Sequence, residues 1–236
     1  MRMHHVLALL FLSAAVPFSQ AQPSKQAGAK REDSSWNTLD AETIKALLKK
    51  ADARNGAVAY EICAACHQPS GAGRSDGTFP QLAGQHATVL VKQMADINAG
   101  RRTSPKMYPF VMTLAGPLEL ADVAAHISSL CIPSEHGRYD GPNVSRQLAL
   151  GKELYEKGCA ACHGKSGEGA KDKFYPVLAG QHYIYLLRQM RDIREGKRHN
   201  ANTDMVKLIG TYSDNNLQEI SAYQSNLEVP GAMCKP

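Results

Sequence analysis

One stretch of this 236-residue chain occurs twice, and the duplication restricts the fold more than any other feature of the sequence. At an offset of 96 residues, positions 61–102 align without a gap on positions 157–198, and 22 of the 42 aligned residues are identical. Shorter flanking matches at offsets of 95 and 97 indicate single-residue changes in loop length. The sequence therefore predicts two copies of one small domain, each of about 90 residues.

Both copies contain Cys-Ala-Ala-Cys-His, at positions 63–67 and 159–163. In this spacing the two thiols can bond to the vinyl groups of a haem while the adjacent imidazole reaches the iron from one face. Cys-x-x-Cys also occurs in redox dithiols and zinc sites, but the histidine that follows each pair favours haem attachment. We therefore expect two covalently bound haem c groups, with thioether bonds from Cys63, Cys66, Cys159 and Cys162 and iron ligation by His67 and His163.

The hydrophobic periodicity of each copy predicts a helix, the haem motif, a loop, a middle helix, a second loop and a final helix. The helix before the second motif is expected to begin at Asn143 or Ser145, and its counterpart in the first copy near Asp40. No segment is a confident strand, so the expected class is all-α, with a small bundle of helices around each haem. We expect middle helices near 85–99 and 181–195, each followed by a helix-ending glycine, and final helices at 118–130 and 214–227, the latter behind Ser213.

The second axial position of each iron decides between electron transfer and catalysis, because a methionine thioether closes the site whereas a vacant position admits substrate. In the second copy, Met205 is the single methionine between the middle and final helices, and the first copy offers Met107 and Met112. Met107 follows its motif histidine by 40 residues and Met205 by 42, whereas Met112 follows by 45. We therefore expect Met107 and Met205 as ligands, with Met112 packing near the haem.

His86 and His182 occupy equivalent positions, each 19 residues after its motif histidine. Two histidine ligands for each iron are thus conceivable. Each of these residues opens a helix, however, and a methionine segment is available in both copies. We therefore expect His86 and His182 to be structural residues.

The N-terminus is typical of a secretory signal peptide, with a basic start, an apolar run at 6–16 and small residues at 19–21. The run of about 11 residues is too short to span a bilayer of about 30 Å. We expect a signal peptide at 1–21, a flexible polar tail at 22–39, and a mature periplasmic protein without a transmembrane segment.

The formal net charge is +5, and the basic residues are scattered along the chain rather than gathered into a nucleic-acid footprint. The local pairs Arg101-Arg102 and Lys197-Arg198 recur at matching points of the two copies. They fit a solvated loop better than a docking patch for an acidic redox partner.

Together these features resemble the two-haem class I cytochromes c of the cytochrome c4 type, over nearly all of the chain after about residue 40. The resemblance rests on the paired haem motifs, the Pro-x-Leu-Ala-Gly-Gln runs at 80–85 and 176–181, the basic turns after the middle helices, and a methionine before each final helix. It implies methionine as the distal ligand. It also implies that the carbonyl groups of Pro80 and Pro176 accept hydrogen bonds from the proximal histidines.

The resemblance implies tandem cytochrome c domains at 40–131 and 143–236, joined by a linker at 132–142. It implies an electron carrier rather than an enzyme, which exchanges electrons with periplasmic or membrane-bound redox proteins, such as a terminal oxidase of a respiratory chain. The alternative is a di-haem enzyme, peroxidase-like or thiosulfate dehydrogenase-like, or the cytochrome subunit of a dehydrogenase. A peroxidase would need an open iron position and a distal acid–base residue, and the sequence shows no insertion to supply them.

Cys131 and Cys234 depart from the family pattern, because neither belongs to a haem motif. In an oxidising compartment they can form a disulfide that ties the C-terminal tail to the start of the linker. Two free thiols, or a cysteine that ligates iron or handles sulfur compounds, are the alternatives.

Overall fold

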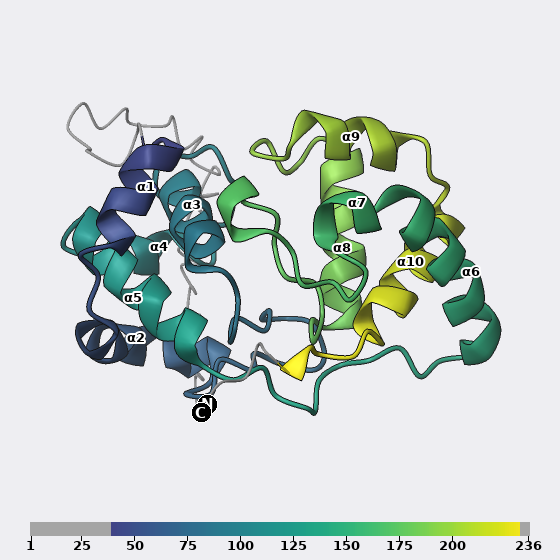
Figure 1. Cartoon of the computed structure of the whole chain (residues 1–236), viewed down its shortest axis with the longest axis horizontal. Coiled ribbons are helices and arrows are strands. Elements are labelled where there is room, and N and C mark those ends of the chain that lie inside the picture. Colours follow the sequence, from purple (N-terminus) through teal and green to yellow (C-terminus); the bar gives the residue numbers. More distant parts are fainter. Residues whose placement is uncertain (1–38, 232–236) are drawn as a thin grey trace, which may run out of the picture. The chain divides into compact units, whose positions relative to one another are not determined.

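The computed structural model describes residues 39–231, so the predicted signal peptide, nearly all of the predicted tail, and Cys234 lie outside the described residues. Among residues 39–231 there is no strand beyond an isolated bridge between Ala170 and Tyr175, and the predicted all-α class is confirmed. The elements in Figure 1 are α1 (Ala41–Leu48), α2 (Ala53–His67), α3 (Ala87–Asn98), α4 (Tyr108–Val111), α5 (Pro117–Ser129), α6 (Val144–Gly158), α7 (Ala160–His163), the 3-10 helix η1 (Lys171–Lys173), α8 (Tyr183–Arg194), α9 (Thr203–Gly210) and α10 (Asp214–Ser225).

The prediction of one helix running from Asp40 into the first haem motif is wrong, because two helices form there. Asp40 caps α1 by accepting a hydrogen bond from the Thr43 backbone N–H at 2.7 Å. After α1 ends at Leu48, Asp52 caps α2 by accepting from the Arg54 backbone N–H at 2.8 Å. Each aspartate satisfies an N–H group that a helix start leaves without a partner, so the second cap favours a new helix.

The middle and final helices lie close to their predicted positions. The helices α3 and α8 are followed by Gly100 and Gly196, whose φ angles are 73° and 69°. Ser213 caps α10 reciprocally with Asn216, whereas Asn143 precedes α6 without a side-chain cap bond. The short helices α4 and α9, in the two methionine segments, were not predicted.

In each repeat the helix that leads into the haem motif crosses the final helix, α2 against α5 and α6 against α10 (Figure 1). The two backbones of each pair come so close that glycine is required at the crossing. A Cβ atom on Gly56 of α2 would lie 1.9 Å from the carbonyl oxygen of Asp122 in α5. A Cβ atom on Gly151 of α6 would lie 2.0 Å from that of Glu219 in α10. One apolar core surrounds each crossing, so the duplicated sequence builds the same helix pair twice.

The predicted linker at 132–142 begins with a residue that is buried in the fold and not exposed to solvent. Ile132 exposes 6% of its surface and belongs to the apolar core of the second repeat. It also lies against Gly84 and Gly180, equivalent turn glycines whose φ angles of 67° and 75° favour glycine. A Cβ atom at these positions would approach Ile132 to 2.6 and 2.4 Å. One isoleucine therefore packs between the two copies of the Leu-Ala-Gly-Gln turn.

The two repeats are joined by reciprocal hydrogen bonds. The Arg102 guanidinium donates to Gln189 Oε1 at 3.3 Å, and its counterpart Arg198 donates to Gln93 Oε1 at 3.1 Å. Equivalent side chains thus exchange the same bond in both directions, as they do across the twofold axis of a homodimer. All of the described helices belong to one compact unit.

Candidate haem sites

Both Cys-x-x-Cys-His motifs lie at the C-terminal ends of helices. The first occupies the last turns of α2, which ends at His67. In the second repeat the helix is interrupted at Cys159, between the end of α6 and the start of α7, and α7 ends at His163. The helix holds the two thiols and the imidazole of each motif at fixed spacing.

None of the four motif cysteines is paired in a disulfide. Burial raises the pKa of Cys63 to about 11 and the pKa of Cys159 to about 12. A redox dithiol works through a thiolate and therefore needs a lowered thiol pKa. Burial therefore gives Cys63 and Cys159 no thiolate character for disulfide exchange.

The proximal histidines are buried and oriented by the prolines that the family resemblance implied. His67 exposes 3% of its surface and donates from Nδ1 to the Pro80 carbonyl oxygen at 2.9 Å. His163 exposes 7% and donates from Nδ1 to the Pro176 carbonyl oxygen at 3.1 Å. Because a carbonyl oxygen only accepts, each Nδ1 carries the proton. Burial lowers the pKa of both rings, so both are neutral near pH 7 and each Nε2 keeps its lone pair.

The His67 ring shows directly that these residues fit a haem iron. Its Nε2 atom is buried, and among the described residues none forms a hydrogen bond with it. A buried polar atom without a partner is costly, and its presence in a folded protein needs an explanation. A haem iron bound at Nε2 would satisfy this atom, and the Pro80 carbonyl would hold the ring in the required tautomer.

The methionine segments have the same local structure in both repeats, which defines their alignment. The Tyr108 N–H donates to the Ser104 carbonyl at 2.9 Å, and the Val206 N–H donates to the Asn202 carbonyl at 3.0 Å. Both bonds open a helical turn, and they are related by an offset of 98. At this offset Met107 coincides with Met205.

The ends of the two turns give the same offset. The Thr113 hydroxyl donates to the Phe110 carbonyl and the Thr211 hydroxyl donates to the Leu208 carbonyl, both at 2.7 Å. The second copy therefore has two more residues than the first between the middle helix and the methionine turn. After the turn the first copy has one more residue than the second, Ala115. Met112, at the end of α4, corresponds to Gly210 rather than to a methionine.

Two aromatic residues beside the proximal histidines were missed by the sequence analysis. The rings of Phe79 and His67 are 6.1 Å apart between centroids, and those of Tyr175 and His163 are 6.3 Å apart. Phe79 and Tyr175 are equivalent in the repeat and each precedes the proline that orients the histidine. Their shared aromatic character was the available signal, but they are not identical and so did not stand out.

His86 and His182, the alternative iron ligands, are instead bonded between the repeats. His86 Nε2 lies 2.9 Å from the Glu168 carbonyl oxygen, and His182 Nε2 lies 2.9 Å from the Ala72 carbonyl oxygen. Since both atoms are occupied by carbonyl groups of the opposite repeat, the structural role expected for these histidines agrees with their contacts.

Cys131 takes part in a disulfide bond. Its predicted partner Cys234 lies outside the described residues. The pairing of these two cysteines therefore stays a prediction.

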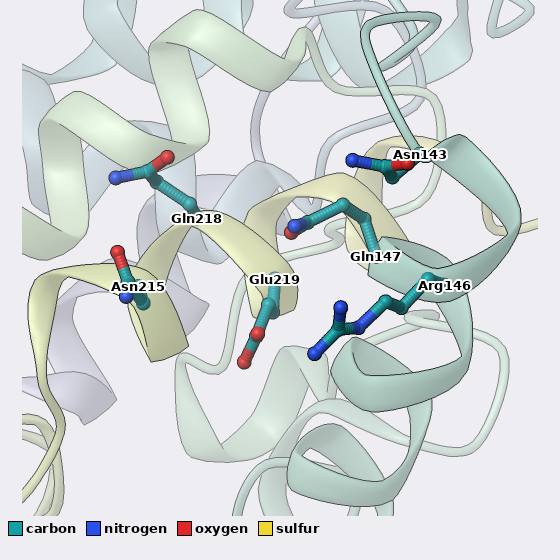
Figure 2. A pocket seen from close by; sticks show the side chains of 6 residues that line it. All are labelled: Asn143, Arg146, Gln147, Asn215, Gln218 and Glu219. Atoms are coloured by element: carbon teal, nitrogen blue, oxygen red, sulfur yellow. The ribbon is translucent and has the colours of Figure 1, made fainter.

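A polar pocket of about 250 Å³ lies between the starts of α6 and α10 (Figure 2). Its six lining side chains include no residue expected to bind haem. They are Asn143, Arg146, Gln147, Asn215, Gln218 and Glu219.

No helix within residues 39–231 combines the length and apolar character needed to cross a membrane. No group of three or more histidine, cysteine, aspartate or glutamate side chains is gathered there as a metal site.

Comparison with known proteins agrees with the duplicated architecture. The cytochrome c family model matches the chain twice, at residues 53–130 and 148–227. Cytochrome c4 from Pseudomonas aeruginosa is 35% identical over 186 residues, covering 75% of this chain and 89% of that protein. A thiosulfate dehydrogenase electron acceptor from Stutzerimonas stutzeri is 34% identical over 172 residues, covering 70% of this chain and 78% of that protein.

Solved structures lead to the same family. The crystal structure of reduced recombinant cytochrome c4 from Pseudomonas stutzeri superimposes with a TM-score of 0.66 at 29% identity, covering 75% of this chain and all of that one. Two covalently bound haem c groups and an electron-carrier function, both predicted from the sequence, are thereby confirmed. The chain belongs to the cytochrome c family and is a di-haem cytochrome of the c4 type.

Proposed function

We propose that the protein is a periplasmic electron carrier in which both haem irons have histidine and methionine as axial ligands. His67 and Met107 are assigned to the first iron, and His163 and Met205 to the second. The thioether bonds are assigned to the two cysteines of each motif. We also propose the domain limits expected from the sequence, 40–131 and 143–236.

The observation that carries this ligand set is the orientation of His67. Its Nδ1 donates to Pro80, and its buried Nε2 has no partner among the described residues. The Met107 assignment is supported by the matching turns that align it with Met205. Met205 packs against the core of the second repeat.

When bound, each haem supplies a one-electron couple between ferric and ferrous iron. The carbonyl groups of Pro80 and Pro176 keep the imidazoles in one orientation and strengthen them as donors. Ligation by Met107 and Met205 would raise the reduction potential and leave no coordination position for a substrate. The chain's residues thus favour reversible electron exchange over bond-making chemistry.

The periplasmic location is supported by two features. The first is the signal peptide predicted at residues 1–21, which lies outside the described residues. The second is the disulfide at Cys131, because such bonds persist in oxidising compartments. We propose redox proteins as partners, with a terminal oxidase of a respiratory chain as one acceptor.

A second candidate function is electron acceptor of a thiosulfate dehydrogenase, which the 34% identity to a protein of that name favours. Rapid mixing of the oxidised holoprotein with thiosulfate and such a dehydrogenase should reduce both haems, whereas thiosulfate alone should not. Failure of the enzyme to speed reduction would remove this candidate. It would leave the ligand assignment intact.

The ligand set is tested by replacing the candidate methionines one at a time. The oxidised holoprotein should absorb near 695 nm through its two iron–thioether bonds, and Met107→Ala and Met205→Ala should each remove about half of that band. Met112→Ala is the matched control and should leave the band in place. Loss of half the band in Met112→Ala, with Met107→Ala unaffected, would overturn the assignment for the first haem.

A further inference from the structure

Each proximal histidine is connected through one peptide group to a glutamine of the opposite repeat. His67 donates to the Pro80 carbonyl oxygen, and the N–H of the same peptide group belongs to Gln81. That N–H donates to Gln181 Oε1 at 3.1 Å. The chain of atoms therefore runs from the imidazole of the first repeat to a side chain of the second.

The second repeat has the same connection in the opposite direction. His163 donates to the Pro176 carbonyl oxygen, and the adjoining Val177 N–H donates to Gln85 Oε1 at 2.9 Å. Gln85 and Gln181 are equivalent residues of the duplicated Leu-Ala-Gly-Gln-His run. The two histidines are thus coupled crosswise, each to the other repeat.

The side-chain amides are fixed in orientation by further bonds. Gln181 Nε2 donates to the Gln81 carbonyl at 2.9 Å, and Gln181 Oε1 also accepts from the His182 N–H at 3.1 Å. Gln85 Nε2 donates to the Val177 carbonyl at 3.0 Å. With N–H donors on each oxygen and a carbonyl acceptor on each nitrogen, neither amide can be reversed without losing its bonds.

The contacts of Gln181 are buried, and those of Gln85 are half-buried. Gln81 exposes 4% of its surface, Gln181 6% and Val177 5%. In such an environment consecutive hydrogen bonds polarise one another, by about 10–30% per bond. An acceptor on the Gln81 N–H therefore makes the Pro80 carbonyl a better acceptor for His67, which increases the electron donation of the imidazole.

We propose that Gln181 and Gln85 are positioning residues that set the reduction potential of the haem in the opposite repeat. Gln181 acts on the haem held by His67, and Gln85 acts on the haem held by His163. A more strongly donating imidazole favours ferric iron, so each glutamine lowers the potential of the opposite haem. This inference rests on the proposed function, in which His67 and His163 are the iron ligands.

The test is a redox titration of the holoprotein that resolves both haems. Met107→His and Met205→His serve as reference variants, since replacing methionine lowers the potential of the haem that loses it and so identifies its step. Gln181→Leu should favour reduction of the first haem by about two- to threefold, or about 18 to 28 mV for a one-electron couple. The second haem should not change. Gln85→Leu should give the reverse pattern.

Thr88→Val is the matched control. It removes another hydrogen bond between the repeats, from the Thr88 hydroxyl to the Lys171 carbonyl at 2.7 Å, without touching either histidine peptide. It should shift neither potential. If a leucine variant does not fold, Gln181→Asn and Gln85→Asn keep an amide that is too short for both bonds and should show the same crossed shifts.

Equal shifts of both haems, a shift of the haem in the same repeat, or no shift would each overturn the inference. The proposed function fails differently. If histidine and methionine were not the ligands of both irons, the unaltered holoprotein would already lack the spectra of histidine–methionine haems. Failure of the crossed coupling alone would leave those spectra unchanged.

Discussion

At the scale of single residues, His67 and His163 are oriented by the prolines at the haem sites, whereas His86 and His182 join the repeats. His182 is bonded at both ring nitrogens. Its Nε2 donates to the Ala72 carbonyl, and its Nδ1 accepts from the Gly137 N–H at 2.9 Å. Protonation of Nδ1 would set two donors against each other, so the contacts require a neutral ring.

This arrangement predicts a pH dependence of stability. Burial lowers the pKa of His182. The nearby His136 lowers this pKa further, whereas Asp76 acts to raise it. The unfolded ring, with a pKa of about 6.5, takes up its proton first as the pH falls. The contribution of His182 is therefore complete above pH 6.5 and is lost as the pH falls toward the folded pKa.

Denaturant titrations of wild type and His182→Gln between pH 7.5 and 5.5 measure this effect. The stability advantage of wild type should shrink as the pH falls. Thr88→Val is the control, because it removes a hydrogen bond between the repeats at a residue that does not titrate, and its stability difference from wild type should stay constant. A pH-independent difference for His182→Gln would contradict this account.

Much at the residue scale could be predicted from the sequence, but not the alignment of the methionine segments. The haem cysteines and the proximal histidines follow from contiguous motifs. From the sequence, Met107 and Met112 could be told apart as ligands only by their distance from the motif histidine. Two insertions and a deletion lie between the segments on either side that align, so the alignment of the methionine segments does not follow from the sequence. The hydrogen bonds of Thr113 and Thr211 supply the missing landmark.

At the scale of elements, the fold rests on two helix crossings made possible by Gly56 and Gly151. The periodicity predicted α6 and the two final helices but merged α1 and α2 into one helix, and the repeat showed that these glycines match. Periodicity reports which face of a helix is apolar and not how closely two backbones approach. The contact of Gly151 with the Glu219 carbonyl therefore became visible only in the structure.

The crossing predicts a large effect of one added methyl group. Gly151→Ala should destabilise the protein by about 3 kcal/mol, because α6 and α10 must move apart and their side chains repack. Gly210→Ala is the matched control, since Gly210 is also helical, at the end of α9, but has no atom within 4 Å of an added Cβ. It should be neutral or stabilising by up to about 1 kcal/mol. Thermal unfolding of the holoproteins compares the two, and equal effects would contradict the close crossing.

At the scale of the whole molecule, the repeats share contacts that neither repeat could make alone. The duplicated sequence predicted two domains and a linker. It could not predict that the linker residue Ile132 packs between Gly84 and Gly180, because repetition shows that a position recurs and not which surface it faces. The reciprocal bonds of Gln85 and Gln181 escaped prediction for the same reason.

Ile132 should therefore contribute to the stability of both repeats. Ile132→Ala should cost about 2–5 kcal/mol, since it leaves a cavity in the second core and removes the contact with the first repeat's turn. Val206→Ala, at a residue that is 39% exposed on α9, should change stability by less than about 0.5 kcal/mol. Calorimetry that found Ile132→Ala as mild as Val206→Ala would contradict the packing described here.

We propose that this molecule holds two closed haem centres, each with a histidine and a methionine on its iron. Low-temperature electron paramagnetic resonance of the fully oxidised holoprotein tests it most directly, because the spectrum distinguishes ligand sets and spin states of the two irons. We predict two low-spin signals typical of histidine–methionine ligation and no high-spin component. A high-spin, bis-histidine or thiolate-ligated iron in either repeat would contradict the claim.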